Sequence, residues 1–366
     1  MGSLDGPDLL ARDSLGLVLG TGAAVEAFDA ARAAADAVEF PFPNDVIRNV
    51  LICGMGGSAI AGELIVGAYR ERLRMPVAVH RDYEIPGWVG PDTLVILSSY
   101  SGNTEETLTA TMQAYERNCP CVAITSGGKL GSFYAKEGIP VVPLPAGMQP
   151  RAALIWLMVP VAVILERTEV LPSLGSEMEE ARETLATVVA ACGPEVPEES
   201  NPAKQLAAAL HGKVALIWGA EVTAPIARRW KGQLNENAKV PAYWSELPEL
   251  NHNEIVGFEG MGPLTSMSQL VMLRDPRNHR QVVRRFDLTS DLIKREVSGV
   301  LSIEAEGRGA MARMLDLVLL GDYVSLYLAL LRGVDPGPVE VIEALKGRLA
   351  NTGYGRSASP EDAGGA

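Results

Sequence analysis

The chain has 366 residues, 47% of them hydrophobic, which is enough apolar material for two domains of ordinary size and excludes a chain that is disordered throughout. A formal net charge of −13 without a long run of Lys or Arg excludes a nucleic-acid-binding surface. Four cysteines without C-x-x-C spacing and four scattered histidines argue against structural zinc and predict free thiols in a reducing compartment.

The amino terminus and the longest apolar run indicate in which cellular compartment the protein is expected. The sequence MGSLDGPDLLARDS is acidic and lacks a basic segment followed by an apolar core, so we expect no secretory signal. The apolar run 152–165 is too short to span a membrane and contains Pro160, so it predicts a buried helix in a core or a subunit interface. These features predict a cytoplasmic protein with no membrane partner.

The first 43 residues predict a helical segment. The Ala-rich stretch 8–39 carries Asp and Arg at the surface positions of a 3.6-residue period, and Pro41 and Pro43 end it. A first domain is predicted over 44–170, because short β-branched runs there alternate with helical periodicity. Its expected strands are 49–53, 77–80, 93–98, 121–125 and 141–144.

The second half of the chain repeats this pattern. Residues 171–203 predict a helix and then an acidic, proline-rich linker, and 204–350 predict a second domain, with 351–366 as a disordered tail. Leu51-Ile52-Cys53-Gly54 is echoed by Leu216-Ile217-Trp218-Gly219, and Val95-Ile96-Leu97 by Val271-Met272-Leu273, in the same order. A duplicated domain is therefore expected, whose second copy has lost its Gly-Ser loops.

Alternating strands and helices predict an α/β fold with a parallel sheet covered by helices on both faces. Ligands of such sheets bind at the carboxyl ends of the strands. Two turns of the first domain lie there: Gly56-Gly57-Ser58, and Ser99 to Thr104 with Ser101 and Gly102 inside it. Hydroxyls and unpaired amides at a helix N-terminus suit a phosphate monoester, although tight turns without a ligand would have the same composition.

A polar stretch in the second half, QLNENAKVPAYWSELPELNHNEIVGF over 233–258, predicts a catalytic site. It gathers Glu236 among asparagines and then His252 between two more, without the alternation of a half-buried strand. A polar loop with Glu236 on a solvated helix face is the alternative interpretation.

The motifs GMGGSAIAGEL, SSYSGNTEETL, Pro150-Arg151-Ala152-Ala153, LNENAK and ELNHNEIVGF together resemble the bifunctional phosphoglucose/phosphomannose isomerases, over about residues 45–350. That family is built from two sugar isomerase (SIS) domains. The resemblance therefore implies two flavodoxin-like SIS domains in an α/β chain, and an aldose–ketose isomerase that interconverts glucose 6-phosphate, with mannose 6-phosphate as a further substrate, and fructose 6-phosphate.

The resemblance also implies a role for each matching residue. Ser58, Ser99, Ser101 and Thr104 would hold the sugar phosphate with the amides of Gly57 and Gly102. Glu236 would move the proton between C2 and C1 through an enediolate, and Arg151 would stabilise that enediolate. His252 would help to open the sugar ring as the contribution of the neighbouring subunit of a homodimer. Neither a metal nor an organic cofactor is implied.

One position departs from the family pattern. Some members carry a lysine that reaches the sugar, and the matching position in this chain is taken to be Tyr327, a neutral phenol that could orient a hydroxyl. This departure and the degenerate second-half loops leave two alternatives open: a phosphosugar-binding protein without hexose 6-phosphate turnover, and an isomerase of another sugar phosphate, such as an amino sugar.

Overall fold

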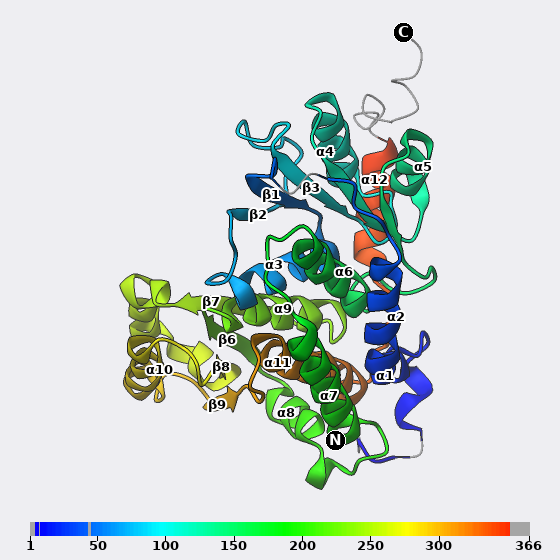
Figure 1. The fold of residues 1–366 in the computed structure, drawn as a ribbon. Helices are drawn as coiled ribbons and strands as arrows, with labels where there is room; N and C mark the ends of the chain where they lie inside the picture. Colours follow the sequence, from blue (N-terminus) through cyan, green and yellow to red (C-terminus); the bar gives the residue numbers. More distant parts are fainter. Residues whose placement is uncertain (1–3, 7, 43–44, 352–366) are drawn as a thin grey trace. The chain divides into compact units, whose positions relative to one another are not determined.

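The computed structural model describes residues 4–6, 8–42 and 45–351, and the chain divides into two compact units (Figure 1). The first-sheet unit contains Glu26–Leu174 and the described residues from Val339 onward. The second-sheet unit contains the described residues up to Val25 together with Gly175–Pro338. Each unit is built around one parallel sheet with helices against it, so the α/β class with two sheets is confirmed.

The sheet of the first-sheet unit has the strand order β2-β1-β3-β4-β5, with every pair parallel. Such an order, in which β1 and β3 lie side by side at the switch point, is that of flavodoxin-like folds. The strands are β1 (Asn49–Cys53), β2 (Val77–His80), β3 (Thr93–Ser98), β4 (Cys121–Thr125) and β5 (Val141–Pro143). The helices are α2 (Ala24–Asp36), α3 (Gly56–Tyr69), α4 (Glu105–Glu116), α5 (Gly128–Glu137), α6 (Leu154–Arg167) and α12 (Glu340–Asn351).

Helices cover both faces of this sheet. On one face, side chains of β1, β3 and β4 pack with α4 and α5 in a core that includes Leu51, Val95 and Tyr134. On the other face, α3 lies so close to β1 that a Cβ on Gly62 would stand 2.8 Å from Cγ2 of Ile52. The apolar run near 152–165 forms α6, which packs on α3 and is buried from Leu154 to Leu165 except for Trp156, confirming a buried helix.

The sheet of the second-sheet unit has the order β7-β6-β8-β9, again parallel throughout. Its four strands correspond in order to the first four of the other sheet, so the predicted internal repeat is confirmed. The strands are β6 (Val214–Ala220), β7 (Ala242–Leu247), β8 (Ser268–Arg274) and β9 (Gly299–Glu304). The α-helices are α1 (Leu17–Gly22), α7 (Gly175–Cys192), α8 (Pro202–Leu210), α9 (Thr223–Glu236), α10 (Arg280–Ile293) and α11 (Ala310–Leu331), and the 3-10 helices are η1 (Leu9–Arg12), η2 (Glu198–Ser200), η3 (Glu249–His252), η4 (Glu254–Gly260) and η5 (Gly262–Met267).

Side-chain alternation along β6 assigns the helices to the two faces of this sheet. Trp218 and Ala220 pack in one core with Phe286 of α10 and with Leu250 of η3. Gly219, which points the other way, lies against the start of α9, where its Cβ would meet the backbone oxygen of Thr223 at 2.3 Å. Helix α9 therefore covers one face, and α10 with η3 covers the other (Figure 1).

The amino-terminal segment differs from the single helix expected over 8–39. It forms η1, α1 and α2. The break between η1 and α1 is made by Asp13, whose carboxylate accepts hydrogen bonds from the backbone N–H groups of Leu17 and Val18 at 2.9 and 2.8 Å. Gly16 supplies the left-handed conformation, with φ +63°, that this capped turn requires. Acidic and alanine-rich periodicity alone did not reveal that cap.

The observed units also differ in extent from the predicted domains. Helix α7, which was expected to lead into a linker, packs on α11 and buries Met178, Ala181 and Leu185 in the second-sheet unit. The remainder of the predicted linker includes Asn201, which caps α8 by accepting from Ala203 and Lys204 at 3.0 Å. Of the tail expected over 351–366, residues 352–366 lie outside the described residues.

Helix α11 is the one described helix that is long and apolar enough to cross a membrane by length and composition. Of its most apolar window, 83% is buried inside the protein, as in the central helix of a packed core.

Candidate functional site

The glycine turn after β1 places Ser58 in the first turn of α3. Gly57 permits the close approach of a neighbouring segment, since a Cβ there would stand 2.7 Å from the backbone oxygen of Pro150. Ser58 is buried, and its Oγ accepts a hydrogen bond from the backbone N–H of Tyr100 at 3.3 Å. The two predicted phosphate turns are therefore joined directly.

The turn after β3 gathers the remaining hydroxyls. Oγ of Ser99 lies 2.9 Å from Oγ1 of Thr104, while Oγ of Ser101 accepts from the backbone N–H of Asn103 at 3.2 Å. Thr104 precedes α4 in an extended conformation, yet its hydroxyl makes no capping bond and is directed to Ser99 instead. Gly102 has φ +66°, and a Cβ on it would stand 1.8 Å from the backbone oxygen of Gly127.

Arg151 lies beside the start of α3. A Cβ on Gly57 would stand 3.6 Å from Cα of Arg151, so the arginine backbone touches the first phosphate turn. The side chain is only 4% exposed, and its Nη1 donates to Oε1 of Gln149 at 3.2 Å. The structure thus places Arg151, whose side chain is buried, next to two helix N-termini and four hydroxyl-bearing residues at the carboxyl ends of β1 and β3, a combination suited to a phosphorylated anion.

Tyr100 is a residue of this site that the sequence motifs did not single out. Its hydroxyl donates to the backbone oxygen of Pro145 and accepts from the backbone N–H of Met148, both at 2.8 Å. Tyr100 therefore ties the segment that carries Arg151 to the serine turn. The signal in the sequence was an aromatic residue between serines in a turn, where small polar residues are usual.

Glu236 is the last residue of α9 in the second-sheet unit and is partly buried. Its backbone oxygen accepts from Nζ of Lys239, which also donates to the backbone oxygens of Pro336 at 3.2 Å and Pro338 at 2.6 Å. Lys239 has φ +56°, the left-handed conformation common just after a helix end. The chain therefore fixes the backbone at Glu236 through a cation at the negative end of the helix dipole.

His252 ends η3 and is exposed. The residue before it is held from two sides, because Asn251 Nδ2 donates to Oγ1 of Thr289 at 2.8 Å and its Oδ1 accepts from Arg285 Nη1 at 3.1 Å. These partners belong to α10, so His252 lies on the α10 face of the sheet and Glu236 on the α9 face. Within one chain, the sheet itself separates the two residues.

The stretch 233–258 contains a strand that its polar composition does not predict. It holds the end of α9, edge strand β7 and then η3 and η4. Strand β7 buries its two ends, Ala242 and Leu247, and leaves the residues between them partly or fully exposed, so its alternation is weak.

Tyr327, the possible sugar contact suggested by the sequence, is a residue of the core. Tyr327 lies in the middle of α11, is 0% exposed, and donates its hydroxyl to the backbone oxygen of Cys192 at 2.6 Å. Its ring stacks on Tyr323 at a centroid distance of 5.9 Å. This phenol is part of the helical core, where a substrate does not reach it.

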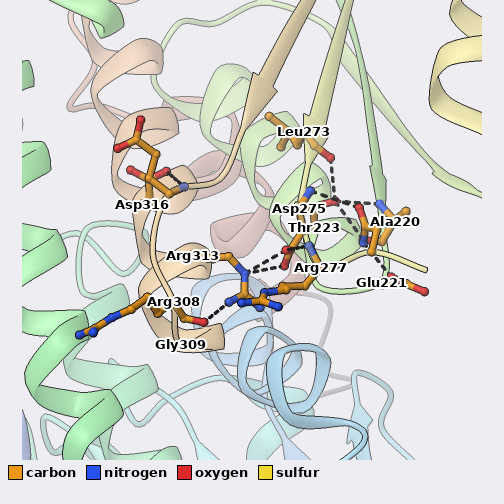
Figure 2. A network of polar contacts seen from close by, with 12 residues as sticks. Ala220, Glu221, Thr223, Leu273, Asp275, Arg277, Arg308, Gly309, Arg313 and Asp316 are labelled. Carbon is orange, nitrogen blue, oxygen red and sulfur yellow. Dashed lines mark hydrogen bonds and ion pairs between the residues drawn. The ribbon is translucent and has the colours of Figure 1, made fainter. Parts of the chain in front are cut away.

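The carboxyl ends of the second sheet are filled by the chain's own groups (Figure 2). Oγ1 of Thr223 donates to the backbone oxygen of Leu273 at 2.8 Å and accepts from the N–H of Ala220 at 2.8 Å. Asp275, after β8, accepts from Nε of Arg313 at 2.9 and 3.1 Å and from the backbone N–H of Arg277 at 2.7 Å. Internal pairs therefore occupy the edge that carries the hydroxyl turns in the other sheet.

A second carboxylate also lies at the carboxyl ends of the second sheet. Glu221 accepts from Nδ2 of Asn278 at 2.8 Å and from the backbone N–H of His279, next to the start of α10, at 3.0 Å. An internal carboxylate thus stands where an anionic ligand would meet a helix N-terminus. Among the described residues, no group of three or more His, Cys, Asp or Glu side chains is placed to hold a metal ion.

Comparison with known proteins identifies the family. A model of the SIS domain matches residues 46–150, and a model of the bacterial phospho-glucose isomerase C-terminal SIS domain matches residues 199–349. A bifunctional phosphoglucose/phosphomannose isomerase of Caldicellulosiruptor bescii is 46% identical over 83% of this chain and 90% of its own length, and one of Aquifex aeolicus is 37% identical over 82% and 90%.

A solved structure agrees on the fold. The crystal structure of a glucose-6-phosphate isomerase-like protein from Thermus thermophilus matches 93% of this chain and 100% of its own, with a TM-score of 0.62 and 21% identity. The predicted family and the two SIS domains are thus confirmed. The chain belongs to the family of bifunctional phosphoglucose/phosphomannose isomerases, which are sugar-phosphate aldose–ketose isomerases.

Proposed function

We propose that this protein interconverts glucose 6-phosphate and mannose 6-phosphate with fructose 6-phosphate by proton transfer between C2 and C1. The observation that carries the proposal is the gathering of Ser58, Ser99, Thr104 and the buried Arg151 at the carboxyl ends of β1 and β3. Family membership supplies the reaction class, since the relatives named above are isomerases of these phosphosugars.

The phosphate is held by the two turns of the first-sheet unit. Ser58, Ser99, Ser101 and Thr104 offer hydroxyls, and Gly57 and Gly102 allow the tight turns that bring these hydroxyls together. The positive ends of α3 and α4 favour a dianion there. Because these contacts involve only the phosphate, they serve glucose and mannose 6-phosphate equally.

The chemical step needs one carboxylate that takes a proton from C2 and returns it to C1, and a fixed cation for the oxyanion that develops. We assign the carboxylate to Glu236 and the cation to Arg151. Arg151 is buried and already oriented by Gln149, so little side-chain freedom is lost when the enediolate forms. No cofactor enters these steps.

Ring opening is assigned to His252 of a second subunit. Histidine titrates near neutrality and can give and take the ring proton. The placement of His252 and Glu236 on opposite faces of the second sheet supports a site completed by a partner, and hence a homodimer with a shared active site. A cytoplasmic location is part of the proposal and agrees with the four free thiols.

The test is turnover of each sugar phosphate by the wild type and by Glu236→Gln, which keeps the shape of the side chain and removes the base. We expect kcat to fall by about a hundred- to ten-thousandfold, the usual contribution of general acid–base catalysis. Glu296→Gln is the matched control, because Glu296 is also partly buried in the second-sheet unit but lies outside the motifs.

A panel with glucose, mannose and glucosamine 6-phosphates separates the alternatives. Turnover of the amino sugar alone would assign another substrate. Thermal stabilisation by a hexose 6-phosphate without turnover would assign a binding protein. A Glu236→Gln rate within about tenfold of the wild type would remove Glu236 from the role of base.

A further inference from the structure

A largely buried polar network joins α9 to α11 in the two turns of α9 that precede Glu236. Asp322 on α11 accepts from Nε and Nη2 of Arg229 at 3.1 and 2.7 Å, and from Nε2 of Gln233 at 2.9 Å. Arg229 and Gln233 occupy successive turns of α9, four residues apart, so they share the helix face that meets α11. Two points of α9 are thus fixed to one carboxylate.

The same face continues past the end of the helix. Nδ2 of Asn237 donates to Oγ of Ser325 at 2.9 Å, and that hydroxyl donates to the backbone oxygen of Asp322 at 2.7 Å. Gln233 and Asn237 stand three residues before and one residue after Glu236. The residues on both sides of the proposed base are therefore held by the turn of α11 that begins at Asp322.

Packing allows the two helices little independent motion. A Cβ on Gly321 would stand 2.1 Å from Nε1 of Trp230, and the indole N–H donates to the backbone oxygen of Leu317 at 2.8 Å. Asp322 follows the glycine at this closest approach. Its carboxylate pairs with Arg229, and the two side chains are 14% and 3% exposed, so solvent weakens the pair only a little.

We propose that Asp322 is a positioning residue for the proton-transfer base: its carboxylate, through Arg229 and Gln233, orients the last turns of α9 and with them Glu236, while Ser325 holds Asn237 beside it, an inference that rests on the proposed function. The carboxylate of Glu236 must meet C2 and C1 in turn, and small displacements at a reacting centre cost large factors in rate. A charged, two-point attachment restrains helix rotation more tightly than apolar packing does.

The experiment uses Asp322→Asn with Asp275→Asn as its matched control. Both carboxylates form buried pairs with an arginine in the second-sheet unit, but Asp275 bonds to Arg313 and is remote from α9's last turn. We expect both variants to lose thermal stability. Only Asp322→Asn should lower kcat, by about ten- to a hundredfold, with KM for the sugar phosphate within about twofold of the wild type.

The double variant that carries Asp322→Asn and Glu236→Gln distinguishes a positioning role of Asp322 from a general loss of structure. If Asp322 acts through Glu236, then Asp322→Asn lowers the residual rate of Glu236→Gln by less than about twofold, since no base remains to be positioned. Ser325→Ala, which keeps the ion pair and removes only the hydroxyl at Asn237, is the milder variant should Asp322→Asn fail to fold. It should lower kcat by about three- to tenfold and likewise have no effect without Glu236.

The outcomes distinguish this inference from the proposed function. An inert wild type, or a Glu236→Gln variant of undiminished rate, would overturn both. An active wild type that needs Glu236, combined with equal kcat for Asp322→Asn and Asp275→Asn, would overturn the positioning role alone. An additive loss in the double variant would do the same.

Discussion

Asp316 on α11 shows what burial does to a single carboxyl group. Its pKa is raised from 3.8 to about 6, chiefly by burial, with the nearby charge of Glu306 adding to the rise. The backbone N–H of Glu306 donates to its Oδ2 at 2.8 Å, which opposes the shift without cancelling it. The folded protein therefore binds a proton here at a pH where the unfolded chain has already released it.

This raised pKa predicts that Asp316→Asn increases the stability of the protein by an amount that depends on pH. Because the folded-state pKa is the higher one, stability contributed by the protonated group is present at low pH and is lost as the pH rises from about 4 through 6. The amide stays neutral and can still accept from Glu306, so the variant should be more stable than the wild type by about 2 kcal/mol at pH 7.5. Denaturant unfolding at several pH values measures it.

The gain should shrink toward zero below about pH 4, where both variants are neutral at this position. Asp82→Asn, at an exposed position of the first-sheet unit, is the control and should change stability by less than about 0.5 kcal/mol at either pH. An equal gain at pH 4 and 7.5 would show that burial of the charge is not its cause.

At the scale of elements, the strands of the first sheet follow from the sequence and the second-sheet elements do so only in part. Four predicted strands have the observed bounds; β1, β3 and β4 are central strands with continuous, largely buried apolar runs, and β2 is a short edge strand with an apolar sequence. Strand β7 was missed because its middle residues are polar or exposed and show neither an apolar run nor a clear alternation. The cap at Asp13 was missed because a helix break by side-chain capping leaves no periodic signal.

The turn between β3 and α4 can be tested through its glycine. Gly102→Ala forces a Cβ into the backbone of Gly127 and requires φ +66° of an alanine, so the hydroxyl turn must move. We expect a loss of about 2–4 kcal/mol in stability and a KM for the sugar phosphate at least about tenfold higher. Steady-state kinetics with either hexose 6-phosphate and thermal unfolding measure the two effects.

Gly138→Ala is the matched control, because Gly138 also has φ +66° but no atom lies within 4 Å of its would-be Cβ. It should cost about 1 kcal/mol for the left-handed conformation and leave KM unchanged. Equal KM values for the two alanine variants would mean that the Gly102 turn does not hold the phosphate.

For the whole molecule, the sequence predicted the duplication and the two neighbouring hydroxyl turns, but not how the proposed catalytic residues are distributed. Ser58 and Ser99 follow β1 and β3, which the flavodoxin-like strand order places side by side, so their proximity follows from the predicted fold. Glu236 and His252 are sixteen residues apart in the chain, and the intervening strand β7 could not be recognised. Their separation by a sheet is a property of the tertiary fold, which spacing in the sequence does not encode.

A shared active site predicts complementation between inactive variants. When Glu236→Gln and His252→Ala proteins are mixed under conditions of subunit exchange, half of the dimers are mixed and each has one intact site. The mixture should recover about a quarter of wild-type activity. Light scattering checks the dimer, and each variant exchanged with itself is the control. A mixture no more active than its parents, from subunits shown to exchange, would place His252 and Glu236 in one subunit or remove one of them from the site.

The internal hydrogen bonds and ion pairs at the carboxyl ends of the second sheet affect how the sequences of the two halves of the chain could diverge. Once Glu221 and Asp275 satisfy the donors there, no ligand requires glycine or serine in those loops, and substitutions accumulate at them subject only to packing. The strands beneath, which form the core, remain constrained by volume and by pairing. Traces of an ancestral gene duplication should therefore survive in β6 and β8 and fade in the turns that follow them, which is where the short echoes in this sequence are found and where they stop.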